Sequence, residues 1–175
     1  MKRSHKFSND SLNPERDEQL ESLNAEILRF NGHQNILGTH YNTLELTSDG
    51  EISRRADCII GVNSDKACFQ LGANLKKHIR EGGGLKFELR VNKELFTFFG
   101  RGSKGLTLED PKEIVFRKSH FESSRTAAIS CSAAAIDIPK HLIKLLKQPS
   151  QEGTLAIIPF HTEPEDDLSL FAALP

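Results

Sequence analysis

The sequence lacks any long apolar run, and this absence excludes one class of protein. No stretch approaches the roughly 20 apolar residues that a helix needs to cross a bilayer. The basic N-terminus, MKRSHKFSND, has no apolar segment behind it and does not resemble a secretory signal. We therefore expect a cytoplasmic protein that does not act on membranes.

Cysteines and catalytic signatures are also scarce. The three cysteines, Cys58, Cys68 and Cys131, are an odd number without CxxC spacing, so neither a disulfide framework nor a zinc knuckle is supported. The loop from Gly100 to Gly105 does not match the phosphate-binding pattern GxxxxGK followed by Ser or Thr, and the serines near Arg125 lack a GxSxG context. The sequence leaves open whether the protein is an enzyme.

Charge is distributed unevenly along the chain. Residues 1–22 are polar with little to bury, which predicts a disordered lead-in, although a short helix over 18–23 is compatible with the sequence. Residues 161–175 carry four acids and no Lys or Arg and form an acidic tail. The remaining residues, 23–160, have 19 bases against 15 acids and are expected to form a single mildly basic domain.

The order of apolar segments predicts an α+β fold made of two duplicated halves, at about residues 26–91 and 95–160. Landmarks recur at a spacing of 70, as in Arg55 and Arg125. The expected strands cover residues 26–30, 43–47, 57–62, 85–91, 95–99, 113–117, 126–131 and 154–160. One helix is expected from Asn63 or Ser64 to the Gly82–Gly84 run, and another is expected after an Asp137 cap. Each half reads strand-strand-strand-helix-strand, so a pseudo-two-fold barrel or sandwich with two helices is predicted.

Several spaced motifs are similar to those of a known family. They are Phe30-x-Gly32-His33-x-Asn35, Thr39-His40, Thr43-Leu44-Glu45, Asp57 to Val62, Asp65-Lys66-Ala67-Cys68, and Arg117-Lys118-Ser119 with Ser124-Arg125-Thr126. With them the chain resembles an archaeal family known only as domain of unknown function 371, over about residues 26 to 147. The resemblance implies no activity. It places Ala133 to Ala135 where the family repeats a charged motif, so one site per chain, on the first half, is expected.

The candidate site residues come mainly from the first half. His33, His40 and Asp57 offer imidazole and carboxylate ligands for a divalent metal. A metal is not the favoured interpretation, because their spacing matches no known ligand pattern and the histidines can instead cap loop backbone or line a polar pocket. Asp65 and Lys66 are expected in the first turn of a helix, where a bound anion would account for the lysine. Two arginines in equivalent places of the halves can clamp the same anion or form structural ion pairs; they are Arg55 and Arg125.

Two functions are compatible with this pattern. In the first, His33, Arg55, Asp57, Lys66 and Arg125 bind an anionic, phosphate- or carboxylate-bearing small molecule in one polar pocket, with His40 or Asp65 as acid or base. The alternative is an RNA or ribonucleoprotein binding module that uses the basic helix face of Lys76, Lys77 and Arg80 with the Gly100–Gly105 loop. A homo-oligomer is compatible with either function.

Overall fold

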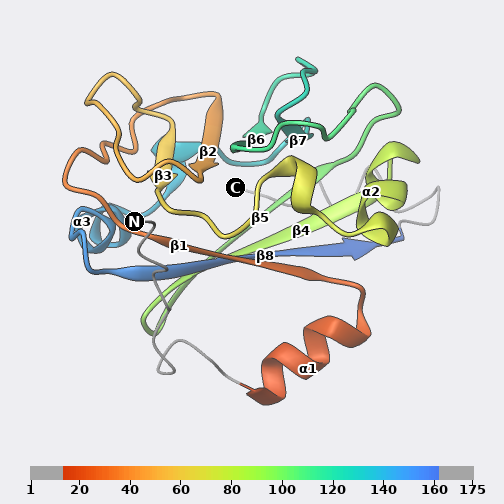
Figure 1. The fold of residues 1–175 in the computed structure, drawn as a ribbon, viewed down its shortest axis with the longest axis horizontal. Helices are drawn as coiled ribbons and strands as arrows, with labels where there is room; N and C mark the ends of the chain where they lie inside the picture. The colour runs from red at the N-terminus through yellow and green to blue at the C-terminus, as the bar shows by residue number, and fades with distance from the viewer. Residues whose placement is uncertain (1–13, 162–175) are drawn as a thin grey trace, which may run out of the picture.

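The protein is an α+β sandwich of two four-stranded sheets, as the computed structural model, which describes residues 14–161, shows (Figure 1). Sheet A has the strand order β1-β8-β4-β5 and is antiparallel throughout. Sheet B has the order β3-β2-β6-β7, with an antiparallel centre and a parallel pair at each side. The predicted α+β class is confirmed.

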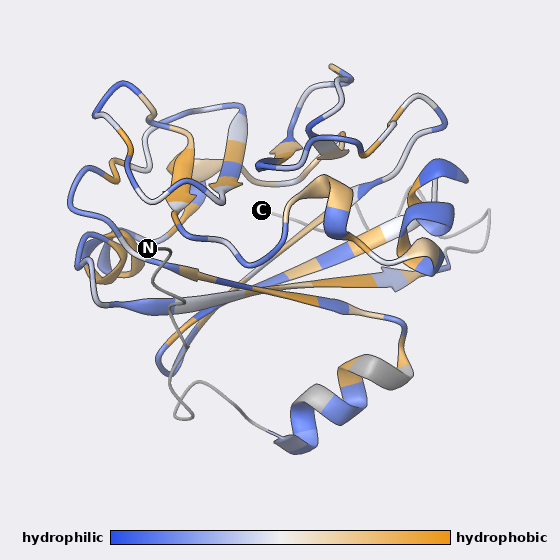
Figure 2. Cartoon of the chain, viewed as in Figure 1, coloured by the Kyte–Doolittle hydropathy of each residue, from blue (hydrophilic) through white to orange (hydrophobic). Residues whose placement is uncertain are grey.

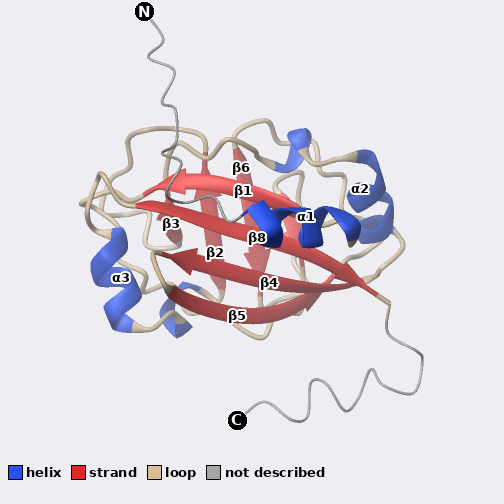
Figure 3. Ribbon diagram, turned by 90° about the horizontal axis from the view of Figure 1, so that it is seen from below, coloured by secondary structure: helices blue, strands red, loops and turns tan. Residues whose placement is uncertain are grey.

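The elements have the following bounds. The strands are β1 (Glu26–Asn31), β2 (Thr43–Thr47), β3 (Ile59–Gly61), β4 (Gly84–Val91), β5 (Glu94–Arg101), β6 (Glu113–Arg117), β7 (Thr126–Ala128) and β8 (Glu152–Phe160). The helices are α1 (Pro14–Ser22), α2 (Ala73–Arg80) and α3 (Lys140–Leu146), with two 3-10 turns, η2 (Cys68–Gln70) and η3 (Ala135–Asp137). From β1 to β8, the second half repeats the element order of the first, and α2 and α3 lie at opposite ends of the sandwich (Figure 3).

The core fills the space between the two sheets. Apolar and polar residues alternate along the longer strands of sheet A (Figure 2), and in β4 this alternation turns one apolar face inward. Three phenylalanines meet at the centre: the ring of Phe87 lies 4.6 Å from that of Phe98 and 4.9 Å from that of Phe116. All three are buried, and burying each contributes about 1.5–3 kcal/mol.

The sheets do not close into a barrel. Their edges meet through one isolated bridge on each side, between Asn31 and Val62 and between Arg101 and Ile129. β3 and β7 are only three residues long, which is too short for a continuous ladder to β1 and β5. Of the two predicted architectures the sandwich is therefore observed, and the barrel is wrong.

The predicted helix beginning at Asn63 or Ser64 is also wrong, because the backbone there is bonded to distant strands. Asn63 has a left-handed φ of 52°, the amide of Ser64 donates to the Thr47 carbonyl, and the amide of Asp65 donates to the Arg29 carbonyl. Helix α2 begins only after Gly72. In the second half, Asp137 likewise lies in η3 and accepts a hydrogen bond from the Ala134 amide instead of capping α3.

Helix α1 corrects the predicted disordered lead-in of residues 1–22. Residues 14–22 are helical and lie against the outer face of sheet A, where Leu20 packs on Ala156 and Ile158 (Figure 1). Arg16 pairs with Glu88 of β4 at 2.9 Å. Residues 1–13, and the predicted tail except His161, lie outside the described residues. No helix between residues 14 and 161 is long and apolar enough to cross a membrane.

Candidate functional site

The two histidines of the predicted pocket are each bound to local loop backbone. Nδ1 of His33 accepts a hydrogen bond from the Asn35 amide at 3.1 Å, and Nε2 lies 3.3 Å from a Glu51 carboxylate oxygen. Nδ1 of His40 accepts from the amides of Asn42 and Thr43 at 3.2 and 3.0 Å. Both imidazole rings therefore cap backbone amides of the loop turns in which they lie.

The side chains of Asp65 and Lys66 contact residues of β1. Neither residue lies in the first turn of a helix, so the predicted reason for a bound anion at Lys66 is wrong. The Asp65 carboxylate accepts from the Arg29 amide at 2.8 Å. Burial raises the pKa of Asp65, and this hydrogen bond opposes the rise. The ammonium of Lys66 lies 2.7 Å from a carboxylate oxygen of Glu26.

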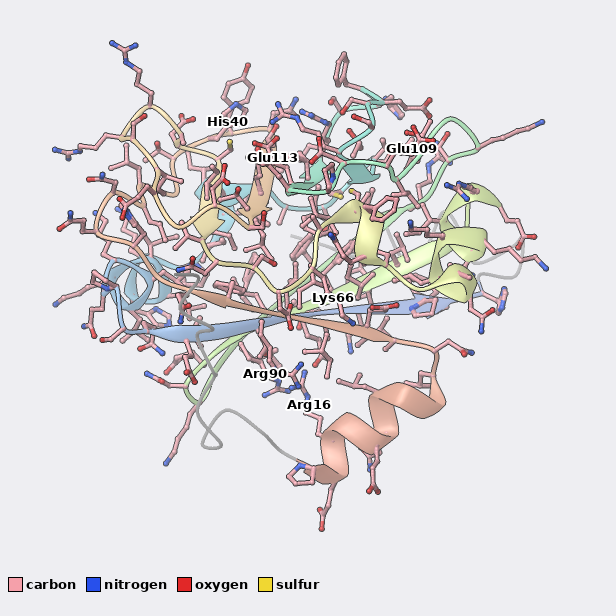
Figure 4. All side chains as sticks on the ribbon, viewed as in Figure 1. Arg16, His40, Lys66, Arg90, Glu109 and Glu113 are labelled. Carbon is pink, nitrogen blue, oxygen red and sulfur yellow. The ribbon has the colours of Figure 1, made fainter. Side chains whose placement is uncertain are left out.

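The remaining candidates do not complete a single pocket. The backbone carbonyl of Asp57 accepts from the amides of Thr39 and His40, while Arg55 is exposed. Figure 4 shows His40 among the loops beyond sheet B and Lys66 beside β1. Within residues 14–161, no group of three or more His, Cys, Asp or Glu side chains is arranged to hold a metal ion.

Arg125 belongs to a charged cluster on the outer face of sheet B. Its guanidinium lies 2.5 Å from a carboxylate oxygen of Glu113 and 3.6 Å from one of Glu45. Glu45 is only 3% exposed, and Cys58 Sγ donates to its second oxygen at 3.4 Å. Arg117 completes the cluster, with Nε donating to the Thr126 hydroxyl at 3.0 Å. Arg125 was predicted either to clamp an anion or to form structural ion pairs, and the structure shows the ion pairs.

The electrostatics of this cluster favour a structural role. Burial raises the pKa of Glu45 and the Glu113 charge raises it further, whereas Arg125 lowers it. Burial also raises the pKa of Cys58 to about 12, and the Glu45 charge adds to this rise. A thiol with such a pKa stays protonated at neutral pH and is not a ready nucleophile. The two arginines and two glutamates compensate one another within the sheet.

A second charged feature is the concave surface beside α2, which we call the basic cleft. It is an open depression of about 780 Å³ lined by Ala73, Lys76, Lys77, Arg80, Glu81, Gly82 and Lys104. Four of these residues are cationic and one is acidic. Because its lining includes both α2 residues and Lys104, the basic cleft combines the basic face of α2 with the Gly100–Gly105 loop of the other half.

The local sequence explains how α2 presents these cations. Leu75, His78 and Ile79 are buried, and this spacing directs Lys77 and Arg80 outward. Arg80 ties the helix to the neighbouring loop, since Nε and Nη2 donate to the carbonyls of Leu106 and Thr107 at 3.4 and 2.5 Å.

Gly102 allows the loop to approach the end of α2. Its amide donates to the Gly83 carbonyl at 2.9 Å, and a Cβ at this position would overlap the Ile79 carbonyl. Only glycine fits so close to another backbone. The cleft thus depends on a contact between the two halves of the chain.

The spaced motifs agree with the comparison to known proteins. The family model described as "Domain of unknown function (DUF371)" matches residues 28–159. The chain belongs to this family. A relative from this comparison is "Uncharacterized protein MJ0206" of the archaeon Methanocaldococcus jannaschii, which is 33% identical over 122 residues, or 70% of this chain and 90% of the relative. The DUF371 match includes residues of both sheets and the basic cleft and stops before the acidic tail.

Sequence reasoning missed one exposed residue beside the cleft. Phe69 is 60% exposed, and the Lys76 ammonium lies 5.2 Å from the centre of its ring. The expected helix from Asn63 concealed it, because a phenylalanine in an amphipathic helix is usually buried. Its signal in the sequence is weak: Phe69 falls outside the apolar spacing of Leu71, Leu75 and Ile79.

Proposed function

We propose that this chain binds RNA through the phosphate backbone in the basic cleft. The observation that carries this proposal is the convergence of four cationic side chains and one carboxylate on a single open surface. Lysine and arginine side chains that neutralise phosphates supply most of the sequence-independent affinity for nucleic acids.

The availability of these cations supports the proposal. Among residues 14–161, the only ion pair of Lys77 is with Glu81, at 3.9 Å. Both side chains are mostly exposed, so this interaction is weak. Lys104 is exposed and makes no hydrogen bond or ion pair to any residue in the described range 14–161. Both can therefore reach an incoming phosphate without breaking a buried pair.

The geometry favours this function over a small anionic metabolite. Small-molecule sites usually enclose most of the ligand surface. The basic cleft is open. Of the residues proposed for an enclosed pocket, His40 lies away from Lys66 (Figure 4), and the side chains of His33, His40, Asp65 and Lys66 are bound to other groups of the protein.

We also infer that the two halves arose by duplication and that the second helix lost one of the cations of the first. The shared element order supports this inference. At a spacing of 67, Ala73 and Lys140 begin the two helices, which aligns Lys77 with Lys144 and Arg80 with Lys147. Ile143 then stands at the place of Lys76, so α3 lacks one of the cations of α2.

A cytoplasmic location remains part of the proposal. Cys58, Cys68 and Cys131 are all free, which fits a reducing compartment. Measuring the free thiols of protein isolated under thiol-trapping conditions tests it, and a disulfide would argue against it.

Salt-dependent binding of a labelled single-stranded oligouridine tests the proposed function. The double variant Lys77→Ala/Lys104→Ala should bind more weakly at every salt concentration, and the slope of log affinity against log salt should fall by about 1.4, or about 0.7 for each lost phosphate contact. The matched control is Lys144→Ala/Lys147→Ala, which removes one exposed lysine of α3 and another directly after its end. Equal losses in both double variants would indicate nonspecific attraction and reject the basic cleft as the site.

A further inference from the structure

Phe69 is a large, exposed apolar side chain on a turn that is held by hydrogen bonds. It lies in η2 between buried Cys68 and Gln70, whose side chain accepts from the Ala67 amide at 2.9 Å and donates to the Pro111 carbonyl at 3.3 Å. The Phe69 amide donates to the Asp110 carbonyl at 2.9 Å. The ring is thus presented on a turn that is fixed from both sides.

Lys76 connects this ring to the basic cleft. Its ammonium donates to the Phe69 carbonyl at 2.7 Å, lies over the ring and also lines the cleft. An exposed aromatic surface therefore begins where the row of cations ends. Proteins that bind single-stranded nucleic acid combine these two elements, a cationic groove for phosphates and an aromatic face for a base.

We propose that the bound RNA is single-stranded and that one unpaired base stacks on Phe69 while neighbouring phosphates contact Lys77 and Lys104. This inference rests on the proposed function of the basic cleft. A duplex presents its phosphates but keeps its base faces covered by neighbouring base pairs, so it cannot use the ring.

The second half has no aromatic ring at the position equivalent to Phe69. The equivalent position, 67 residues later, is Ile136, which is 52% exposed and whose amide donates to the His40 carbonyl at 3.1 Å. An isoleucine has no π face on which a base can stack. The proposed stacking site is consequently not repeated at this position, and Ile136→Ala provides a matched control for the loss of an exposed apolar side chain.

The first experiment compares three probes: a single-stranded oligonucleotide, the same sequence in a duplex, and inorganic polyphosphate. Phe69→Ala should weaken single-strand binding about 5- to 150-fold and leave duplex and polyphosphate binding unchanged. Ile136→Ala should bind all three probes like the wild type. Thermal melts establish that each variant is folded.

A second variant reports stacking directly. The chain contains no tryptophan, so Phe69→Trp introduces a single fluorophore at the proposed contact. It should retain single-strand affinity, and its fluorescence should be quenched by the single strand but not by polyphosphate.

The outcomes separate the two proposals. Unchanged single-strand binding by Phe69→Ala, together with weakened binding by Lys77→Ala/Lys104→Ala, would overturn the stacking inference and keep the proposed function. An equal loss for all three probes in Phe69→Ala would also overturn it, because Phe69 would then act only by positioning Lys76. Full binding by the lysine variant would reject both.

Discussion

Asp65 and Ser132 make the same pair of hydrogen bonds in the two halves of the chain. The amide of Asp65 donates to the Arg29 carbonyl at 2.9 Å, and its carboxylate accepts from the Arg29 amide at 2.8 Å. The amide of Ser132 donates to the Phe99 carbonyl at 2.8 Å, and its hydroxyl accepts from the Phe99 amide at 3.0 Å. A carboxylate and a hydroxyl thus perform one structural task.

Asp65→Ala should lower the free energy of unfolding by about 1–2 kcal/mol, because the Arg29 amide loses its side-chain acceptor. Asp65→Ser should recover most of this loss, since Ser132 achieves the same bond with a hydroxyl. Urea unfolding followed by circular dichroism measures both. Equal destabilisation by the two substitutions would indicate that the negative charge, and not the hydrogen bond, is required.

His40 has a similar counterpart in Asp110. The Asp110 carboxylate accepts from the amides of Lys112 and Glu113 at 2.9 and 2.8 Å, as His40 does from Asn42 and Thr43. The free energy of unfolding of His40→Asp should therefore lie within about 1 kcal/mol of the wild-type value, whereas that of His40→Ala should be lower by about 1–2 kcal/mol. A large loss in His40→Asp would show that the imidazole has a role beyond capping the turn.

Gly102→Ala should destabilise the protein by about 3 kcal/mol, because the new Cβ would overlap the Ile79 carbonyl. Gly32→Ala should behave alike, since its Cβ would meet the Leu146 carbonyl. In the control Gly50→Ala, the Cβ meets only the side chain of Asn63 at an exposed site, and the change should stay within about 0.5 kcal/mol. Thermal and urea unfolding measure all three. A Gly102→Ala protein as stable as the control would mean that the loop can move away from α2.

The buried Glu45 predicts a dependence of stability on pH. Burial raises the pKa of its carboxyl in the folded state above the ordinary value of 4.5, so the folded protein holds the proton more tightly than the unfolded chain does. Protonation of Glu45 therefore stabilises the folded protein fully at pH values below 4.5, and this stabilisation is lost as the pH rises through the folded-state pKa of Glu45. Glu45→Gln removes this titration.

The measurement is the free energy of unfolding of wild type and Glu45→Gln at a series of pH values from 4 upward. As the pH rises, the free energy of unfolding of Glu45→Gln should increase relative to that of the wild type. Glu109→Gln, which removes an exposed carboxylate (Figure 4), is the matched control. A constant difference between wild type and Glu45→Gln would contradict the raised pKa of Glu45.

The order of strands could be predicted because it follows from local patterns. The alternation of apolar residues in β4, from Leu85 to Val91, fixes both the strand and its buried face. The same reasoning identified the equal element order of the two halves. It failed for residues 63–67, where the amides of Ser64 and Asp65 bond to strands far away in sequence.

The sequence alone therefore determined the fold class, the order of the strands and the basic face of α2, all of which depend on residues close together in the chain. Only the tertiary structure decided which charged groups meet. It separated His40 from Lys66, paired Arg125 with Glu45 and Glu113, and brought Lys104 to α2. The physical reason is that a charged side chain is satisfied by whichever partner the folded backbone places near it, and spacing along the sequence does not specify that partner.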